Sequence, residues 1–128
     1  MAVKFQTEEW AKEVTNALQS NEAVGNAAKG QTTAIQFVTS DAPGGEVKTF
    51  VRINDGIAEV GVGEVEGAEA TITQNYETAV AIDKGELNSQ AAFMQGKIKI
   101  SGNMMKLMAL QGFIQAVGPA TAGVEREY

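Results

Sequence analysis

The stretch that decides the fold is residues 91–117, AAFMQGKIKISGNMMKLMALQGFIQAV. Its pattern predicts a short apolar helix, then a strand of alternating lysine and isoleucine, then a long final helix that Asn103 caps. That final helix has little polar surface, because residues 103–117 hold a single charged side chain, Lys106. One apolar face of the helix can pack on a sheet, and the other must be covered by a partner chain or by an apolar ligand.

The rest of the chain predicts one α+β domain over residues 1–128, in which residues 119–128 form a loose tail. Apolar periodicity predicts helices at residues 7–20, 21–30, 75–85, 89–94 and 103–117. Alternation predicts strands at residues 32–39, 46–54, 57–64, 68–73 and 97–101. Asp55 and Gly56 predict a tight hairpin, and Pro119 is expected to end the final helix. We therefore predict a single five-stranded, largely antiparallel sheet with helices packed on it.

Composition disfavours several classes of function. The 128 residues carry a net charge of −6 without a cluster of lysine or arginine, which argues against nucleic acid and against anionic membrane surfaces as partners. Cysteine and histidine are absent, so thiolate nucleophiles, zinc–sulfur sites and the commonest general base are excluded. We expect no secretory signal and no stable membrane insertion, because no apolar stretch is long enough, and we expect a cytoplasmic protein.

Two motifs suggest chemistry that their context disfavours. Residues 61–67, GVGEVEG, are glycine-rich, but they follow a strand without a helix next, and their carboxylates would repel phosphate. We interpret them as a twisted or bulged strand. A nearby acidic group is the second motif, whose residue types suit a cation site or paired catalytic carboxylates. Because strand alternation turns these side chains mostly outward, we interpret them as a solvated face. The acidic group comprises Glu59, Glu64, Glu66 and Glu69.

The final helix is the remaining candidate site. At about 100° per residue it has two apolar sectors. One sector holds Met104, Leu107 and Met108 together with Gln111 and Gln115. The adjoining sector is formed by Leu110, Ile114 and Val117. Three interpretations stay open: the second sector lines a ligand cavity, packs in an ordinary core, or forms a dimer contact. In a cavity, a glutamine amide could hydrogen-bond the head group of a ligand.

A family resemblance bears on this choice. Residues 93–103, FMQGKIKISGN, followed by an apolar helix with Met104 and Leu107, resemble the sterol carrier protein type 2 (SCP-2) sterol transfer family. Residues 68–73, AEATIT, followed by a helix that ends at Gly85, are similar to the strand and helix that precede this motif in the family. The resemblance covers residues 5–118.

The resemblance implies helices and a five-stranded sheet that enclose an apolar tunnel for a fatty acid, a fatty acyl-CoA, a sterol or another lipid. It implies binding, and in some members transfer, without a cofactor, metal or catalytic residue. The alternative is an interaction module that dimerises through the apolar face of the final helix, so a homodimer stays possible. The expected ligand contacts are Phe93, Met94, Ile98, Ile100, Met104, Leu107, Met108, Gln111 and Ile114.

Overall fold

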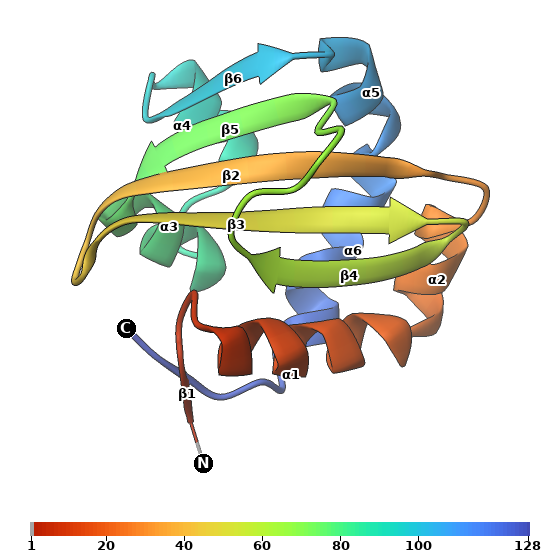
Figure 1. Ribbon diagram of the computed structural model, residues 1–128, viewed down its shortest axis with the longest axis horizontal. Helices are drawn as coiled ribbons and strands as arrows, with labels where there is room; N and C mark the ends of the chain where they lie inside the picture. Colours follow the sequence, from red (N-terminus) through yellow and green to blue (C-terminus); the bar gives the residue numbers. More distant parts are fainter. Residues whose placement is uncertain (1) are drawn as a thin grey trace.

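The computed structural model describes residues 2–128 and contains a five-stranded sheet in the order β4-β3-β2-β5-β6 (Figure 1). The strands of this sheet are β2 (Thr33–Ala42), β3 (Gly45–Asn54), β4 (Ile57–Val62), β5 (Ala70–Asn75) and β6 (Ile98–Gly102). The helices are α1 (Glu8–Gln19), α2 (Glu22–Ala28), α3 (Tyr76–Asp83), α4 (Ser89–Met94), α5 (Met104–Ala109) and α6 (Gln111–Thr121). Within this sheet β2 and β5 pair in parallel and the other neighbouring strands pair antiparallel, which confirms the predicted α+β class and largely antiparallel sheet.

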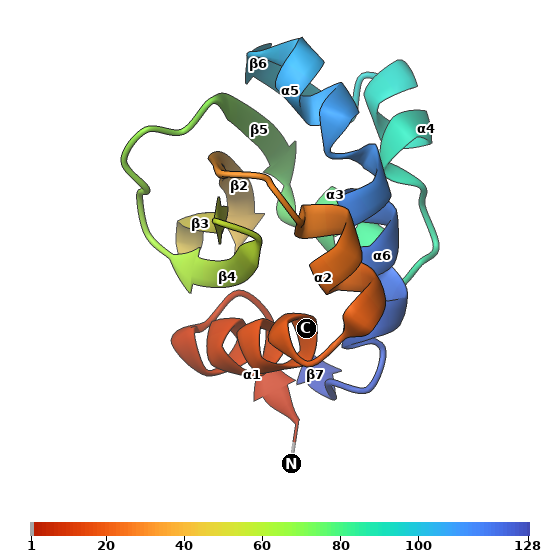
Figure 2. The same cartoon turned by 90° about the vertical axis from the view of Figure 1, so that its right-hand side faces the viewer.

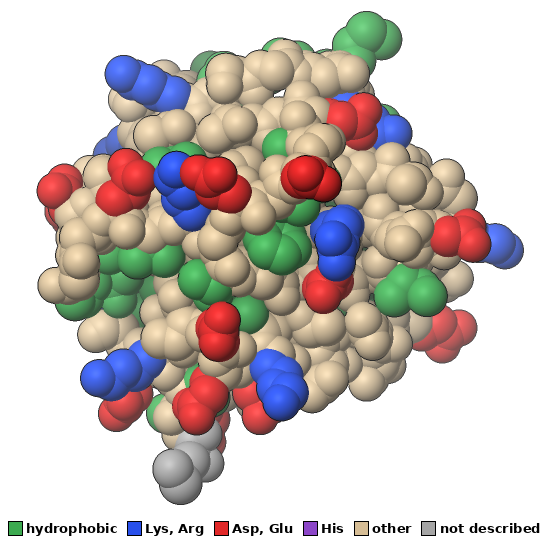
Figure 3. Space-filling view, viewed as in Figure 1, with side chains coloured by type: hydrophobic (Ala, Val, Ile, Leu, Met, Phe, Trp, Pro, Cys, Tyr) green, Lys and Arg blue, Asp and Glu red, His purple; other side chains and the backbone are tan. Residues whose placement is uncertain are grey.

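The helices lie on one side of the sheet, and α1 runs along its β4 edge (Figure 2). The core between the two layers is fully apolar at its centre, where Leu18, Val24 and Ile53 are each about 1% exposed. Leu107 and Phe113 bring α5 and α6 into the same core. The opposite face of the sheet carries interspersed acidic and basic side chains, with apolar side chains exposed between them (Figure 3).

The parallel pairing of β2 with β5 requires a crossover, since β4 lies at the far edge of the sheet. The segment 63–69 makes this crossover over the open face of the sheet (Figure 1). Gln36 fastens it there: its side chain donates to the carbonyls of Thr49 (2.8 Å) and Gly63 (3.0 Å) and accepts from the Val65 amide (2.8 Å). Gln36 is buried, and these three bonds satisfy its amide.

Local sequence signals account for the helix starts. Asn103 Oδ1 accepts from the Lys106 amide at 3.0 Å, and Asn75 Oδ1 accepts from the Thr78 amide at 2.8 Å. Each side chain satisfies one of the amides that a helix start leaves without a partner. The hairpin at Asp55 and Gly56 is also confirmed, with φ values of 49° and 82° that match a type I′ turn.

The prediction of one long final helix was wrong. The helix breaks at Leu110, whose backbone has φ −94° and ψ 7°, and resumes as α6. Leu107, Leu110 and Phe113, before, at and after the break, all lie in the core. Pro119 does not end α6, which continues to Thr121. Near the end of a helix, proline removes only its own amide donor from the hydrogen-bond ladder.

The prediction of a loose tail was also wrong. The tail contains β7 (Arg126–Glu127), which pairs in parallel with β1 (Val3–Lys4). Arg126 forms an ion pair with Asp83 at 3.3 Å and donates to the Thr121 carbonyl at 2.8 Å. The Tyr128 ring packs 5.2 Å from the Phe5 ring. Two-residue strands have no periodicity to detect, so the sequence pattern held no signal for this closure.

Tyr128 in the tail is expected to make the free energy of unfolding fall at alkaline pH. Burial, and then the hydrogen bond to Asp83, raise the pKa of Tyr128 to about 12. In the unfolded chain the pKa of a tyrosine is near 10. Below that pH the raised pKa of Tyr128 does not change the free energy of unfolding. As pH rises from about 10 toward 12 the free energy of unfolding falls, because the Tyr128 hydroxyl loses its proton more readily in the unfolded chain than in the folded one. We expect Tyr128→Phe to flatten this part of the stability curve, measured by urea unfolding. Since burial also raises the pKa of Tyr76, Tyr76→Phe is the comparison, and an unchanged curve in Tyr128→Phe would contradict the assignment.

Candidate functional site

The nine expected ligand contacts divide by burial. Ile98 and Leu107 are buried and Ile100 is half-buried. The other six are exposed: Phe93 (45%), Met94 (85%), Met104 (43%), Met108 (69%), Ile114 (42%) and Gln111. The exposed members come from α4 and α5, which lie near the β6 edge of the sheet toward opposite ends of β6, and from α6, which runs from α5 toward α1 (Figures 1 and 2).

Exposed apolar side chains are concentrated on these three helices. Of the eight large hydrophobic side chains exposed within residues 2–128, six lie there. We call these six the methionine patch: Phe93, Met94, Met104, Met105, Met108 and Ile114. Monomeric proteins seldom expose large contiguous apolar surfaces without a functional reason.

A glutamine pair joins the two sides of the patch. Gln90 Nε2 on α4 donates to Gln111 Oε1 at the start of α6, at 3.4 Å. Met94 lies one helical turn after Gln90, and Met108 lies three residues before Gln111. Residues four apart share a helix face, so Met94 lies on the side of α4 that carries Gln90, whereas the break at Leu110 separates Met108 from Gln111. Gln90 and Gln111, which the sequence places on separate predicted helices, therefore meet at this junction.

The helix-facing side of the sheet holds an apolar strip that sequence reasoning missed. Cross-strand pairing aligns Phe37 of β2 with Ile72 of β5, and Ile72 with Ile100 of β6. Paired residues share a sheet face, and Ile35, on the same face of β2, is in the core. All three side chains of the strip are nevertheless only half-buried, so the helices cover them incompletely. The sequence pattern does not reveal this strip, because alternation within a strand specifies neither which strands become neighbours nor the register in which they pair.

The helical side of this layer is also partly open. Ala116, Val117 and Ala120 of α6 pack against the core yet stay half-buried, whereas Leu110 at the break and Phe113 of α6 are buried. The burial of individual residues shows which parts of the two predicted sectors face the core. Leu107, Leu110 and Phe113 form the core side, and Met104, Met108 and Gln111 face outward. The candidate site is the apolar layer between the strip and α6, bordered by the methionine patch.

Two surface hollows lie elsewhere. A groove of about 340 Å³ separates α1 from β4 and is lined in part by Lys12, Phe50 and Glu59. A second hollow, of about 600 Å³, includes Tyr76 and Tyr128. Neither contains any of the nine expected contacts, and both have charged side chains in their walls. They are less suited to a hydrophobic ligand than the layer beneath α6.

The interpretation of the glycine-rich segment as a strand holds for its first two residues, Gly61 and Val62 of β4, whereas residues 63–67 belong to the crossover. Gly61 lies opposite Phe50 in the β3–β4 pair, and a Cβ on Gly61 would collide with the Phe50 ring. Gly63 has φ 114° and its amide donates to the Lys48 carbonyl at 2.7 Å, where the crossover begins. The glycines therefore make room for an aromatic ring and a turn.

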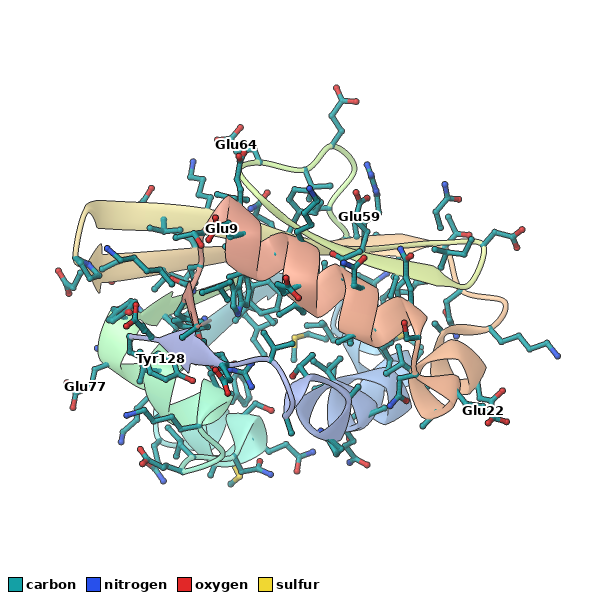
Figure 4. The ribbon with its side chains drawn as sticks, turned by 90° about the horizontal axis from the view of Figure 1, so that it is seen from below. Glu9, Glu22, Glu59, Glu64, Glu77 and Tyr128 are labelled. Carbon is teal, nitrogen blue, oxygen red and sulfur yellow. The ribbon has the colours of Figure 1, made fainter. Side chains whose placement is uncertain are left out.

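The acidic side chains do not converge. Glu59 pairs with Arg52, Glu64 with Lys48 at 2.7 Å, and Glu59 and Glu64 project outward at separate places (Figure 4). The hydrogen bond from Lys48 lowers the pKa of Glu64. Glu69 accepts from Thr33 and lies 3.9 Å from Lys106 Nζ. Within residues 2–128, three carboxylates nowhere gather closely enough to hold a metal ion.

Comparisons with known proteins agree with this architecture. The sequence profile of the SCP-2 sterol transfer family matches residues 12–115. Sterol carrier protein 2 of Gallus gallus is 40% identical over 85 residues, which are 66% of this chain and only 16% of that relative's length.

Solved structures share the fold. A crystal structure of sterol carrier protein 2 superposes with a TM-score of 0.79 at 22% identity, over 94% of this chain and 99% of that one. The solution structure of palmitated SCP2L2 from Aedes aegypti has a TM-score of 0.65 at 19% identity, over 88% and 95% of the two chains. The profile match, the identity to the curated relative and the shared fold support lipid binding or transfer in general, and they establish that the chain belongs to the SCP-2 sterol transfer family.

Proposed function

We propose that this domain binds a hydrophobic ligand without catalysis and carries it, with a fatty acid, a fatty acyl-CoA, a sterol or another lipid as the candidates. The observation that carries the proposal is the incompletely covered apolar layer between the sheet strip and α6 in a member of this family. The palmitated relative from Aedes aegypti, whose fold is shared, favours an acyl chain as the first ligand to test.

The proposed ligand lies with its hydrocarbon between the strip and α6. Ile98, Ile100 and Leu107 would contact it from the interior, whereas Phe93, Met104 and Ile114 would close its rim. The outermost contacts would be Met94 and Met108 at the mouth, where an incoming lipid passes. Methionine suits a rim that must repack around ligands of different shape, because its side chain is flexible and polarisable.

The polar end of the ligand would meet the glutamine pair. Gln111 is exposed and its Oε1 is already near Gln90 Nε2, so the pair can rotate to offer both a donor and an acceptor. Such a neutral contact accepts a carboxylate, an ester or a hydroxyl.

The expected affinity is micromolar. Burial of about ten methylene groups contributes roughly 8 kcal/mol at about 0.8 kcal/mol each. Loss of translational freedom and ordering of the ligand and rim side chains oppose this gain. Since a net 8 kcal/mol would correspond to roughly 1 μM, the dissociation constant is expected to lie above about 1 μM.

Two measurements test the proposal. Solvent extraction of the purified protein followed by mass spectrometry is expected to release a lipid, and a fluorescent fatty acid is expected to bind and be displaced by palmitate. The double variant Met104→Gln and Ile114→Gln removes two exposed rim contacts and is expected to weaken binding by about tenfold or more. Ile57→Gln, an exposed apolar side chain on β4 (61%), is the matched control and should bind as the wild type does.

Two outcomes would count against the proposal: a wild-type protein that neither carries lipid nor binds the probe, or a rim variant that binds as tightly as the control. Sizing of the same samples addresses the dimerisation alternative. A stable dimer without lipid, dissociated by the rim substitutions, would favour the interaction module instead.

A further inference from the structure

Two polar atoms in the interior of the domain lack a hydrogen-bond partner within residues 2–128. They are Gln6 Oε1 and Trp10 Nε1, and both are buried. Gln6 is only 7% exposed, and the other end of its amide, Nε2, donates to Thr39 Oγ1 at 3.0 Å. Because a buried polar group without a partner destabilises a fold, an open acceptor and an open donor beside the start of α1 call for an explanation.

Thr39 fixes the position of the Gln6 amide relative to the apolar layer. Thr39 follows Phe37 by two positions in β2, so both side chains face the helices. Strand pairing aligns Thr39 with Gln74 of β5, and Gln74 with Ile98 of β6. A second row of side chains therefore runs beside the apolar strip, from Ile98 at the β6 edge to Thr39 with its bonded Gln6. This row begins apolar and ends polar, whereas the strip beside it is apolar throughout.

Backbone conformation and aromatic packing hold Gln6 and Trp10 in place. Gln6 has φ 63°, a left-handed conformation that residues other than glycine seldom adopt. Thr7 follows it and caps α1, since its hydroxyl accepts from the Trp10 amide at 3.3 Å. The Trp10 ring packs against the core and meets the Phe5 ring edge-on, with 5.3 Å between the centroids. Groups that are held in this way are preorganised for a ligand.

We infer that Gln6 and Trp10 form a polar subsite inside the apolar layer, which takes a hydroxyl group at the far end of a lipid's hydrocarbon chain. One hydroxyl is both donor and acceptor, so it can donate to Gln6 Oε1 and accept from Trp10 Nε1. A carboxylate does not suit this place, because neither side chain can neutralise its charge. The inference rests on the proposed function and deepens it, since it names the class of lipid: a fatty acid that also carries a terminal hydroxyl group.

Ile98 connects the subsite with the proposed mouth. It is a proposed interior contact of the ligand and lies two strands away from Thr39 in the same row. Since neighbouring strands are about 4.8 Å apart, roughly 10 Å of the layer separates the two positions. A hydrocarbon chain that enters beside Ile98 and crosses toward β2 brings its far end to the Gln6 amide. The carboxylate of the same lipid stays at the exposed contact between Gln90 and Gln111.

Anchoring of the N-terminal segment explains only part of this arrangement. The bond from Gln6 Nε2 to Thr39 ties that segment to β2, but it uses only the donor end of the amide. The packing of Trp10 against Phe5 uses the rings and does not use the indole N–H. An anchor therefore needs neither of the two open atoms, whereas a hydroxyl subsite needs both.

Displacement of a fluorescent fatty acid from the full chain, after removal of bound lipid, tests the inference. No helix within residues 2–128 is long and apolar enough to cross a membrane, and the assay uses buffer without vesicles or detergent. The competitors are palmitate and palmitate with a hydroxyl on its last carbon. The wild type is expected to bind the hydroxylated acid about tenfold more tightly, because two buried groups gain hydrogen bonds. In a purely apolar pocket the same hydroxyl would weaken binding.

Two variants, Gln6→Met and Trp10→Phe, each remove one partner of the hydroxyl and keep much of the side-chain volume. Each is expected to lower the ratio of the two affinities most of the way to unity, because the hydroxyl then meets one polar group instead of two. The matched control is Gln19→Met on the same helix. The Gln19 amide donates to the Ala58 carbonyl of β4 at 3.1 Å, so this variant should keep the wild-type ratio.

The inference is overturned if the wild type shows no preference for the hydroxylated acid, which would leave ordered water as the partner of the two atoms. It is also overturned if both subsite variants keep the wild-type ratio, as residues with a purely structural role would even where both affinities fall. If either result is found while the wild type binds palmitate, the subsite fails and the proposed function stands. If the wild type binds neither acid, the proposed function fails as well.

Discussion

Gly102→Ala is expected to lower the free energy of unfolding by about 3 kcal/mol or more, a large part of the roughly 5–15 kcal/mol that stabilises a typical domain. Gly102 ends β6 with φ +103°, a conformation that costs other residues on the order of 1–3 kcal/mol. A Cβ at this position would also lie 2.5 Å from the Glu69 carbonyl oxygen and 2.8 Å from Ala70 Cα. Both obstacles are backbone atoms, so no side-chain rotation relieves the contact.

The consequences extend beyond one strand end. Gly102 pairs with Ala70, and the next amide, that of Asn103, donates to the Glu69 carbonyl at 2.8 Å. Asn103 also caps α5. A shift at Gly102 therefore disturbs the β5–β6 edge and the start of the helix that carries the methionines. We expect the variant to lose ligand binding together with stability.

Urea unfolding followed by circular dichroism measures this effect, with Gly112→Ala as the matched control. Gly112 lies in α6 without a positive φ, and a Cβ there would meet no atom within 4 Å. Alanine is favoured over glycine in a helix by about 1 kcal/mol, so the control is expected to be as stable as the wild type or slightly more stable. Equal stability of the two variants would contradict the close approach at Gly102.

The sequence was sufficient for the elements whose signals are local. Asn103, Asn75 and Thr7 each accept an amide hydrogen bond at the predicted helix start, because capping depends only on residues two or three positions away. The hairpin at Asp55 and Gly56 was equally predictable, since its positive φ values suit those residue types.

The failures share a different cause, which is dependence on distant partners. The strip of Phe37, Ile72 and Ile100 exists only after β5 inserts between β2 and β6, and no local pattern specifies that order. The tail is ordered by Arg126 meeting Asp83, 43 positions away in the chain. Such contacts become visible only when the whole fold is assembled.

The break at Leu110 affected the candidate site most. A helix wheel carried through residues 103–117 assumes a constant 100° step, and the break resets that step in the middle. Within α5, before the break, the wheel also grouped Met104 with Leu107, although the first is 43% exposed and the second is buried. It also omitted Phe113, the aromatic side chain that anchors α6.

Phe113→Ala is expected to destabilise the protein by about 3–5 kcal/mol, as large-to-small changes at buried aromatic positions do. Phe113 is 4% exposed and joins Leu107 and Leu110 in the core. Its removal leaves a cavity that this helix pair cannot close without moving away from the sheet. The neighbouring variant Ile114→Ala changes an exposed side chain (42%) and is expected to alter stability by less than about 1 kcal/mol.

For ligand binding we expect the reverse order, with the larger loss of affinity in Ile114→Ala. Binding must be measured under conditions in which both variants are folded. Phe113→Ala enlarges the interior, and the native fraction is expected to retain fatty-acid binding. Ile114→Ala removes a proposed rim contact and is expected to weaken binding several-fold, since a few buried methylenes are each worth about 0.8 kcal/mol. The assignment of core and rim to adjacent positions of α6 would be wrong if Ile114→Ala proved the more destabilising variant, or if Phe113→Ala alone reduced affinity in its folded state.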